Sequence, residues 1–124
     1  MLRYTATNDK QLLNTLNKAI FGEDFAEEVG YVLFDDDLPL GVARLTVTPD
    51  KTVLERIGIL EEYRGRRIGD FFTRSLINTV SYATDVIEIA YKSDYFKKFG
   101  FTEGGRGMTI VADDLTFPCE CKGE

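Results

Sequence analysis

The sequence contains no histidine, only two cysteines and no uninterrupted apolar run long enough to cross a bilayer. The lack of histidine removes the commonest general base and excludes a Ser-His or Cys-His catalytic pair within one chain. Cys119 and Cys121 are separated by one residue, which is a poor spacing for an unstrained disulfide, so we expect both thiols to stay reduced and to be incidental. With so few nitrogen and sulfur ligands, we expect no metal site.

The chain also lacks an excess of positive charge and a basic start followed by an apolar run. Its formal net charge is −6, and its 124 residues are 44% hydrophobic. Nucleic-acid binding depends on clustered cations, and a signal peptide needs the missing pattern. We therefore expect one soluble cytoplasmic domain over residues 1–117, a C-terminal tail over residues 118–124, and neither a nucleic acid nor a membrane as partner.

The apolar spacings predict a mixed α+β chain in the order β-α-β-β-β-α-β-α-β-β. The expected strands cover residues 2–5, 29–34, 40–48, 53–60, 85–91, a stretch from 101 onward, and 108–112. The expected helices run from Thr7 or Asn8, as the N-cap, to Phe21-Gly22, from 68 to 80, and from 94 to 99 with Ser93 as the cap. The apolar phase changes near Ala43 and Arg44, which predicts a β-bulge there.

Residues 52–80 form an expected strand, loop and helix whose loop has phosphate-binding features. Arg64 to Gly69 bring two glycines and three arginines into six positions. The first turn of a helix presents unpaired amide groups and partial positive charge. Gly65 and Gly69 lack a Cβ, so the loop can take left-handed dihedrals and a diphosphate can approach the main chain. Spacing alone leaves an alternative open, in which this is a solvated charged turn that begins an amphipathic helix.

Arg64-Gly65-Arg66-Arg67-Ile68-Gly69, after the strand segment Ile57-Gly58-Ile59, resembles the acyl-CoA signature of the GNAT family of N-acetyltransferases, Gln/Arg-x-x-Gly-x-Gly/Ala. Arg67 replaces the family's fourth-position glycine and would be strained if that site needs a positive φ. The later segment Tyr95-Phe96-Lys97-Lys98-Phe99-Gly100-Phe101 resembles the family's Phe-Tyr-Glu-Lys-Leu-Gly-Phe, at the expected separation.

The resemblance implies a mostly antiparallel central sheet flanked by helices, acetyl-CoA as cosubstrate and an amine acceptor, with direct transfer of the acetyl group to a primary amine of a small molecule or protein. It places main-chain groups of Ile57 and Ile59 against the pantetheine arm and the amides of residues 65–70 around the pyrophosphate. The implied cofactor-binding residues are Ile57, Ile59, Arg64, Gly65, Arg66, Arg67, Ile68, Gly69, Asp70, Ser93 and Phe96. The alternative for Ile57 and Ile59 is that they are plain core residues.

The resemblance also suggests the catalytic groups. Glu55, on the strand face of Ile57 and Ile59, is the candidate base, acting through water, although an exposed strand glutamate is an equal alternative. The family commonly has an acidic tyrosine where this chain has Phe96, which has no proton to give. Tyr95 and Tyr91 are the remaining candidates, and each is otherwise a partly buried aromatic residue.

Arg67 and Phe96 favour a second interpretation, a module of the same fold that binds acyl-CoA without turnover or serves in protein interactions. A nucleic-acid binder through the arginine cluster is disfavoured by the acidic net charge. The sequence identifies no acceptor, and it leaves a homodimer open.

Overall fold

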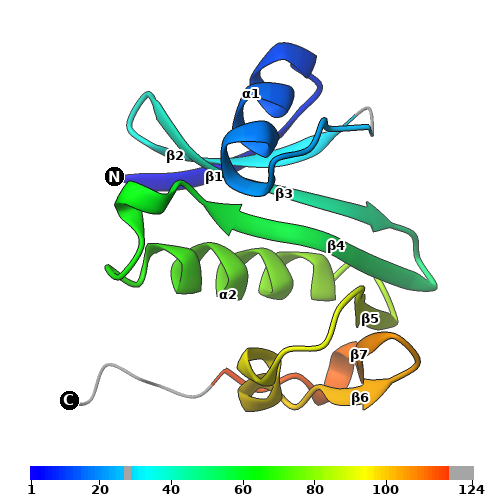
Figure 1. Cartoon of the computed structure of the whole chain (residues 1–124). Helices are drawn as coiled ribbons and strands as arrows, with labels where there is room; N and C mark the ends of the chain where they lie inside the picture. The colour runs from blue at the N-terminus through cyan, green and yellow to red at the C-terminus, as the bar shows by residue number, and fades with distance from the viewer. Residues whose placement is uncertain (27–28, 118–124) are drawn as a thin grey trace. The chain divides into compact units, whose positions relative to one another are not determined.

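The computed structural model describes residues 1–26 and 29–117 (Figure 1). Cys119, Cys121 and the expected tail over residues 118–124 lie outside the described residues. The strands are β1 (Leu2–Thr7), β2 (Gly30–Asp35), β3 (Leu38–Val47), β4 (Lys51–Ile59), β5 (Val86–Ile89), β6 (Thr102–Gly104) and β7 (Gly107–Val111). The helices are α1 (Lys10–Phe21) and α2 (Ile68–Ser81), with the short 3-10 helices η1 (Glu61–Tyr63), η2 (Asp94–Phe99) and η3 (Ala112–Asp114). The expected order of strands and longer helices is confirmed.

Contacts divide the chain into two compact units. The first contains Met1–Leu45 and Glu55–Leu76, and the second contains Thr46–Leu54 and Ile77–Glu124. Strands are neighbours in the order β1-β2-β3-β4 in the first unit and β4-β5-β7-β6 in the second, because the two halves of β4 belong to different units. The β4–β5 pair is parallel, whereas β1–β2, β2–β3, β5–β7 and β6–β7 are antiparallel. The fold class is therefore the predicted α+β class with a mostly antiparallel sheet.

In the first unit, α1 and α2 cover opposite faces of the sheet (Figure 1). The cluster under α1 consists of Leu13, Leu16, Phe25, Val32 and Val42. On the other face, the Tyr4 ring lies 6.2 Å from that of Phe72, and the Tyr4 hydroxyl donates to the carbonyl of Ser75 at 3.0 Å. This hydrogen bond fixes β1 to helix α2.

Helix α1 begins one position later than predicted with Asn8 as the N-cap, and two positions later than predicted with Thr7. Asp9 is the N-cap, and its carboxylate accepts from the amide of Leu12 at 3.2 Å. The Thr7 hydroxyl instead accepts from the Asp9 amide at 3.2 Å, in a turn ahead of the helix. A carboxylate is a strong N-cap acceptor for the positive end of the helix dipole. The predicted end is confirmed, because Gly22 ends α1 with φ 76°.

The register shift in the β2–β3 pair lies at Leu40 and not near Ala43 and Arg44. Leu33 faces Gly41 and Phe34 faces Pro39, so that Leu40 is the extra residue. Leu40 to Ala43 are all buried, because helices cover both faces of the sheet. A strand covered on both sides does not need to alternate, so the apolar phase was a poor indicator of the bulge.

In the second unit, the end of β5 closely contacts the start of β7. A Cβ on Gly107 would lie 1.7 Å from the Ile89 carbonyl oxygen and 3.0 Å from the Tyr91 amide nitrogen. Only glycine fits this approach. The predicted turn before β4 is confirmed by the Thr48 amide, which donates to the Lys51 carbonyl at 3.1 Å. Within the described residues, no helix is both long and apolar enough to span a bilayer.

Candidate functional site

The loop between β4 and α2 has a left-handed backbone at two positions. After the 3-10 helix η1, the Arg64 amide donates to the Glu61 carbonyl at 3.1 Å. Gly65 then has φ 85° and Arg67 has φ 64°, immediately before α2 begins at Ile68. The side chains of residues 64–67 are exposed. The chain therefore turns sharply here and presents a basic loop at the start of a helix.

Arg67 occupies a conformation that a long side chain rarely adopts. Among the described residues, only Asp36 and Arg67 combine a side chain with a positive φ. Aspartate adopts this region readily, whereas for other non-glycine residues the left-handed conformation costs roughly 1–2 kcal/mol of conformational energy. The expected need for a positive φ at this position is thus confirmed. Arginine is strained there, whereas glycine would adopt the same φ without strain. Strain of this kind persists where the surrounding structure requires the conformation.

The first residues of α2 form the anion-binding geometry of a helix N-terminus. Phe71 donates its amide to the Arg67 carbonyl at 3.0 Å, whereas the amides of residues 68–70 precede any intrahelical acceptor. A Cβ on Gly69 would lie 3.8 Å from the Ile59 side chain, which is ordinary contact. The Asp70 carboxylate accepts from Arg74 Nε at 2.9 Å along the helix. These positions can present main-chain donors to a diphosphate.

Strand β4 continues beyond its partner. Its described pairing with β5 ends at Leu54 opposite Ile89, and Ala90 donates its amide to the Leu54 carbonyl at 2.9 Å. β4 nevertheless runs to Ile59. Within residues 1–26 and 29–117, the main-chain groups of β4 after Leu54 therefore have no ladder partner in β5. An unpaired strand edge can accept an extended ligand arm.

Glu55, Ile57 and Ile59 share one face of β4, as alternation requires. Ile59 is buried on the side of α2, where it contacts Gly69. Glu55 and Ile57 are half-buried. In the first unit, Ile59 therefore lies beside the start of α2, and Glu55 and Ile57 precede it on the same face of β4.

The other predicted site residues belong to the second unit. The Ser93 hydroxyl accepts from the Tyr95 amide at 3.3 Å, which confirms the predicted cap. Phe96 is only 2% exposed. Its ring lies 5.9 Å from Tyr91, 5.2 Å from Tyr95 and 5.6 Å from Phe101. Tyr91, Tyr95 and Phe96 thus form one edge-packed aromatic cluster.

Solved structures share this arrangement of elements. The ribosomal-protein-S18-alanine N-acetyltransferase of Escherichia coli matches with a TM-score of 0.74 and 14% identity over 98% of both chains. A Brucella melitensis GNAT acetyltransferase, solved with acetyl-CoA, matches with a TM-score of 0.70 and 12% identity over 90% of this chain and 88% of that one. Arabidopsis thaliana Naa50, solved with the bisubstrate analogue CoA-Ac-MVNAL, matches with a TM-score of 0.68 and 18% identity over 84% of this chain and 85% of that one. This chain has the GNAT fold. No family model and no curated protein sequence matches it.

One charged cluster in the first unit has no counterpart among the residues predicted from the sequence. Arg44 of β3 and Arg56 of β4 both lie at ion-pair distance from Glu23, in the loop after α1. These three residues are far apart in the sequence and match no motif. Only the pairing of the strands and the path of the loop bring them together, so no signal in the sequence could have identified them. Among the described residues, no group of three or more Cys, Asp or Glu could hold a metal ion.

Proposed function

We propose that this chain binds acetyl-CoA and transfers its acetyl group to a primary amine. The observation that carries the proposal is the backbone of the loop before α2, where Gly65 and Arg67 both take positive φ and residues 64–67 are exposed. The GNAT fold supports it, because the Brucella melitensis structure with this fold contains acetyl-CoA.

The cofactor would be held mainly by main-chain groups. The pyrophosphate would accept from the amides at the start of α2, and the exposed Arg64 and Arg66 would neutralise its charge. The pantetheine arm would lie along the edge of β4 that β5 leaves unpaired, with the main chain of Ile57 and Ile59 as partners.

Transfer requires a neutral amine close to the thioester carbonyl. The amine nitrogen forms a bond to the carbonyl carbon, the C–S bond breaks, and the nitrogen loses one proton while the thiolate gains one. Glu55, through a water molecule, is the proposed acceptor of the amine proton. The proton for the thiolate would come from Tyr91, Tyr95 or solvent, because Phe96 has none to give.

The buried Phe96 favours a second candidate function. It fills the aromatic cluster at 2% exposure, so the position of the family acid serves packing in this chain. A GNAT fold that binds acyl-CoA without turnover, or that serves in protein interactions, would need no acid there. The two functions differ in catalysis and not in the binding loop.

The decisive experiment is calorimetric titration of acetyl-CoA into the parent chain and two matched variants. Gly69→Ala adds a methyl group in ordinary contact with Ile59 and should keep binding. Gly69→Asp adds a carboxylate beside the diphosphate and should abolish it. Lys98→Ala, in η2, should have little effect. No binding to the parent at millimolar acetyl-CoA, or equal losses in all variants, would reject the loop as the cofactor site.

Turnover is tested by thiol release against polyamines, aminoglycosides, amino acids and peptide N-termini. Glu55→Gln should lower the rate by about 10²–10⁴-fold, the usual contribution of a proton acceptor, without changing acetyl-CoA affinity. If acetyl-CoA binds but no amine is acetylated, the non-catalytic function replaces the enzyme.

A further inference from the structure

Arg64 and Arg66, on either side of Gly65, are exposed cations without a carboxylate partner. Among the described residues, neither guanidinium group takes part in an ion pair, although Glu61 and Glu62 lie just ahead in η1. The chain as a whole is acidic, with a formal net charge of −6. Two positive charges are therefore left unneutralised at one short loop.

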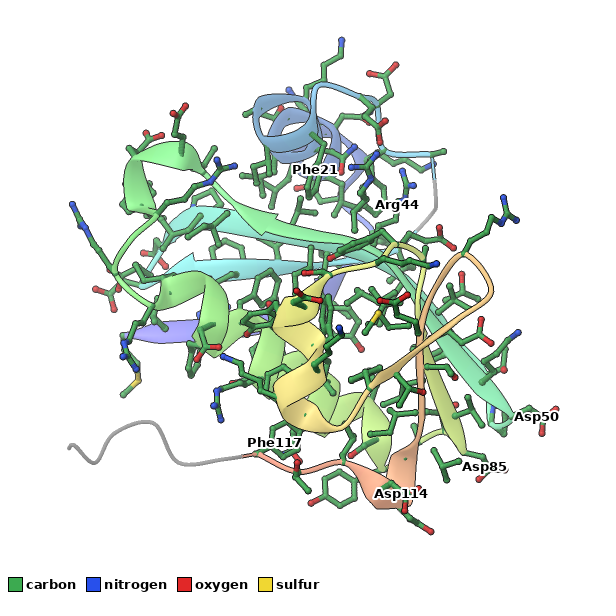
Figure 2. All side chains as sticks on the ribbon, turned by 60° about the horizontal axis from the view of Figure 1, so that its bottom comes forward. Phe21, Arg44, Asp50, Asp85, Asp114 and Phe117 are labelled. Atoms are coloured by element: carbon green, nitrogen blue, oxygen red, sulfur yellow. The ribbon has the colours of Figure 1, made fainter. Side chains whose placement is uncertain are left out.

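Two other arginines of the first unit are matched with carboxylates. Arg74 Nε lies 2.9 Å from Asp70 Oδ2 along α2, and Arg44, labelled in Figure 2, lies 3.7 Å from Glu23 Oε1. Asp70 is the only acidic residue from 63 to 74, and Arg74 orients its carboxylate along the helix. Within the described part of the chain, an external anion therefore has no bound carboxylate to displace from the two loop guanidinium groups.

The Arg66 side chain is turned back toward η1. The central carbon of its guanidinium lies 6.0 Å from the centre of the Tyr63 ring, at the outer range of a cation–π contact. Tyr63 is half-buried at the end of η1, and its amide donates to the Leu60 carbonyl at 3.0 Å. Figure 1 shows η1 beside the start of α2, with the loop between them. Arg66 thus points toward η1, while amides without an intrahelical acceptor lie at the other end of the loop.

Coenzyme A offers two kinds of phosphate to such a loop. Its diphosphate consists of two singly charged phosphates, which main-chain amides at the start of a helix suit well. Its 3′-phosphate is a monoester with a charge of about −1.5 to −2 at pH 7, and a planar guanidinium can bind its terminal oxygens by two parallel hydrogen bonds. One ribose ring separates the two groups, which is a distance that an arginine side chain can bridge.

We propose that Arg66 binds the 3′-phosphate of coenzyme A and that the chain therefore prefers acetyl-CoA to acetyl-dephospho-CoA, which lacks this phosphate. The inference rests on the proposed function, because that function places the diphosphate at the start of α2. Tyr63 is a positioning residue that holds the guanidinium on the η1 side of the loop before the nucleotide binds. Arg64, which has no aromatic contact in the described part of the chain, neutralises the diphosphate.

The competing explanation is that Arg66 only adds positive charge near the cofactor. Charge at long range acts on every phosphate, so its loss would weaken acetyl-CoA and acetyl-dephospho-CoA by similar factors. A bidentate contact with the 3′-phosphate affects only the ligand that has this group. The ratio of the two dissociation constants therefore separates the explanations.

The test is calorimetric titration of both thioesters into the full chain at one fixed salt concentration. We expect the parent to bind acetyl-CoA at least about tenfold more tightly than acetyl-dephospho-CoA. In Arg66→Gln, this ratio should fall to about one, while affinity for acetyl-dephospho-CoA changes by less than about threefold. Arg64→Gln should weaken both ligands by the same factor. Arg3→Gln is the matched control, because Arg3 also stacks on a ring, that of Phe34 at 4.4 Å, and should change neither affinity.

The Tyr63 contact is tested by a conservative pair of variants. Tyr63→Phe keeps the aromatic face and should keep the preference for acetyl-CoA, whereas Tyr63→Leu removes that face and should lower the preference by about threefold. A merely structural role of Tyr63 would instead lower the melting temperature or weaken both ligands equally, and would leave the preference unchanged. Thermal melts of every variant check that the chain is folded.

Two results overturn the assignment of Arg66. One is a preference of the parent below about threefold. The other is a preference that Arg66→Gln leaves unchanged, whether or not both affinities fall.

Failure of the proposed function is a separate outcome. If the preference is found but no amine is acetylated, the transfer reaction fails and the phosphate site stands. If neither thioester binds, titration of adenosine 3′,5′-bisphosphate and of AMP decides instead. A preference for the bisphosphate that Arg66→Gln removes supports the site, and equal binding or none overturns it.

Discussion

The amide of Phe71 donates to the carbonyl oxygen of Arg67 at 3.0 Å, although Arg67 itself has φ 64°. A residue that accepts this bond at the start of a helix usually has an extended backbone. Here the loop enters the helix from the left-handed region, so that the main chain at the start of α2 depends on a conformation that arginine disfavours.

Replacement of Arg67 by glycine should remove this strain. The change relieves roughly 1–2 kcal/mol in the folded state and costs up to about 1 kcal/mol through the freer unfolded chain. We expect the free energy of unfolding to rise by up to about 1 kcal/mol, measured by urea denaturation. Arg67→Ala, which keeps the strain, should show no gain. Acetyl-CoA affinity should stay within about tenfold in both variants, and a larger loss in both would show that the guanidinium grips a phosphate.

Gly107→Ala should destabilise the second unit severely. Its Cβ would meet the main chain of Ile89 at 1.7 Å, and a main chain cannot rotate away as a side chain does. We expect a loss of at least about 3 kcal/mol in the free energy of unfolding. Gly104→Ala is the matched control, because its Cβ would lie 3.2 Å from a methyl group of Thr109 and should cost less than about 1 kcal/mol. Similar losses in both variants would contradict the close approach.

Thr52→Val should leave stability unchanged or raise it. Thr52 is fully buried, and within the described residues its hydroxyl has no hydrogen-bond partner. Removal of an unpaired buried hydroxyl without a change of shape leaves the free energy of unfolding unchanged or raises it by up to about 1 kcal/mol. Thr84→Val should instead lower the free energy of unfolding by about 1–2 kcal/mol, because the Thr84 hydroxyl donates to the Thr48 carbonyl at 2.7 Å. The comparison requires only thermal or urea unfolding of the two variants.

Phe96→Tyr restores the residue that the GNAT resemblance implies. If solvent protonates the departing thiolate, a positioned phenol should raise the rate of acetyl transfer. If Tyr95 or Tyr91 already donates, this variant should change little, and Tyr95→Phe or Tyr91→Phe should lower the rate with unchanged acetyl-CoA affinity. The free energy of unfolding of Phe96→Tyr provides a control. A hydroxyl buried without a hydrogen-bond partner in the aromatic cluster would lower it by about 1–3 kcal/mol.

The sequence predicted the features that depend on neighbours along the chain. The helix over Ile68–Ser81 followed from its apolar spacing, and the short helix of Ser93 to Gly100 followed from its two caps, since Gly100 has φ 105°. The basic loop followed from its glycines and arginines, and its left-handed fourth position was anticipated from the resemblance.

Features that depend on partners across the fold could not be predicted. The extra residue at Leu40 is set by the register against β2, and the choice of Asp9 over Thr7 as a cap is set by its backbone angles, φ −72° and ψ 95°. The meeting of Glu23 with two arginines requires the folded sheet. Composition and periodicity contain no information about such distant pairs.

The Tyr4–Ser75 hydrogen bond has a consequence for synthesis on the ribosome. Its two residues are 71 positions apart, so at roughly 5–20 residues per second the hydroxyl waits about 4–14 seconds for its acceptor to be made. Over that interval, β1, β2 and β3 have emerged without the helix that later covers one face of their sheet. The nascent chain therefore exposes an apolar sheet surface during this period, and it is then that chaperones would have the most to bind.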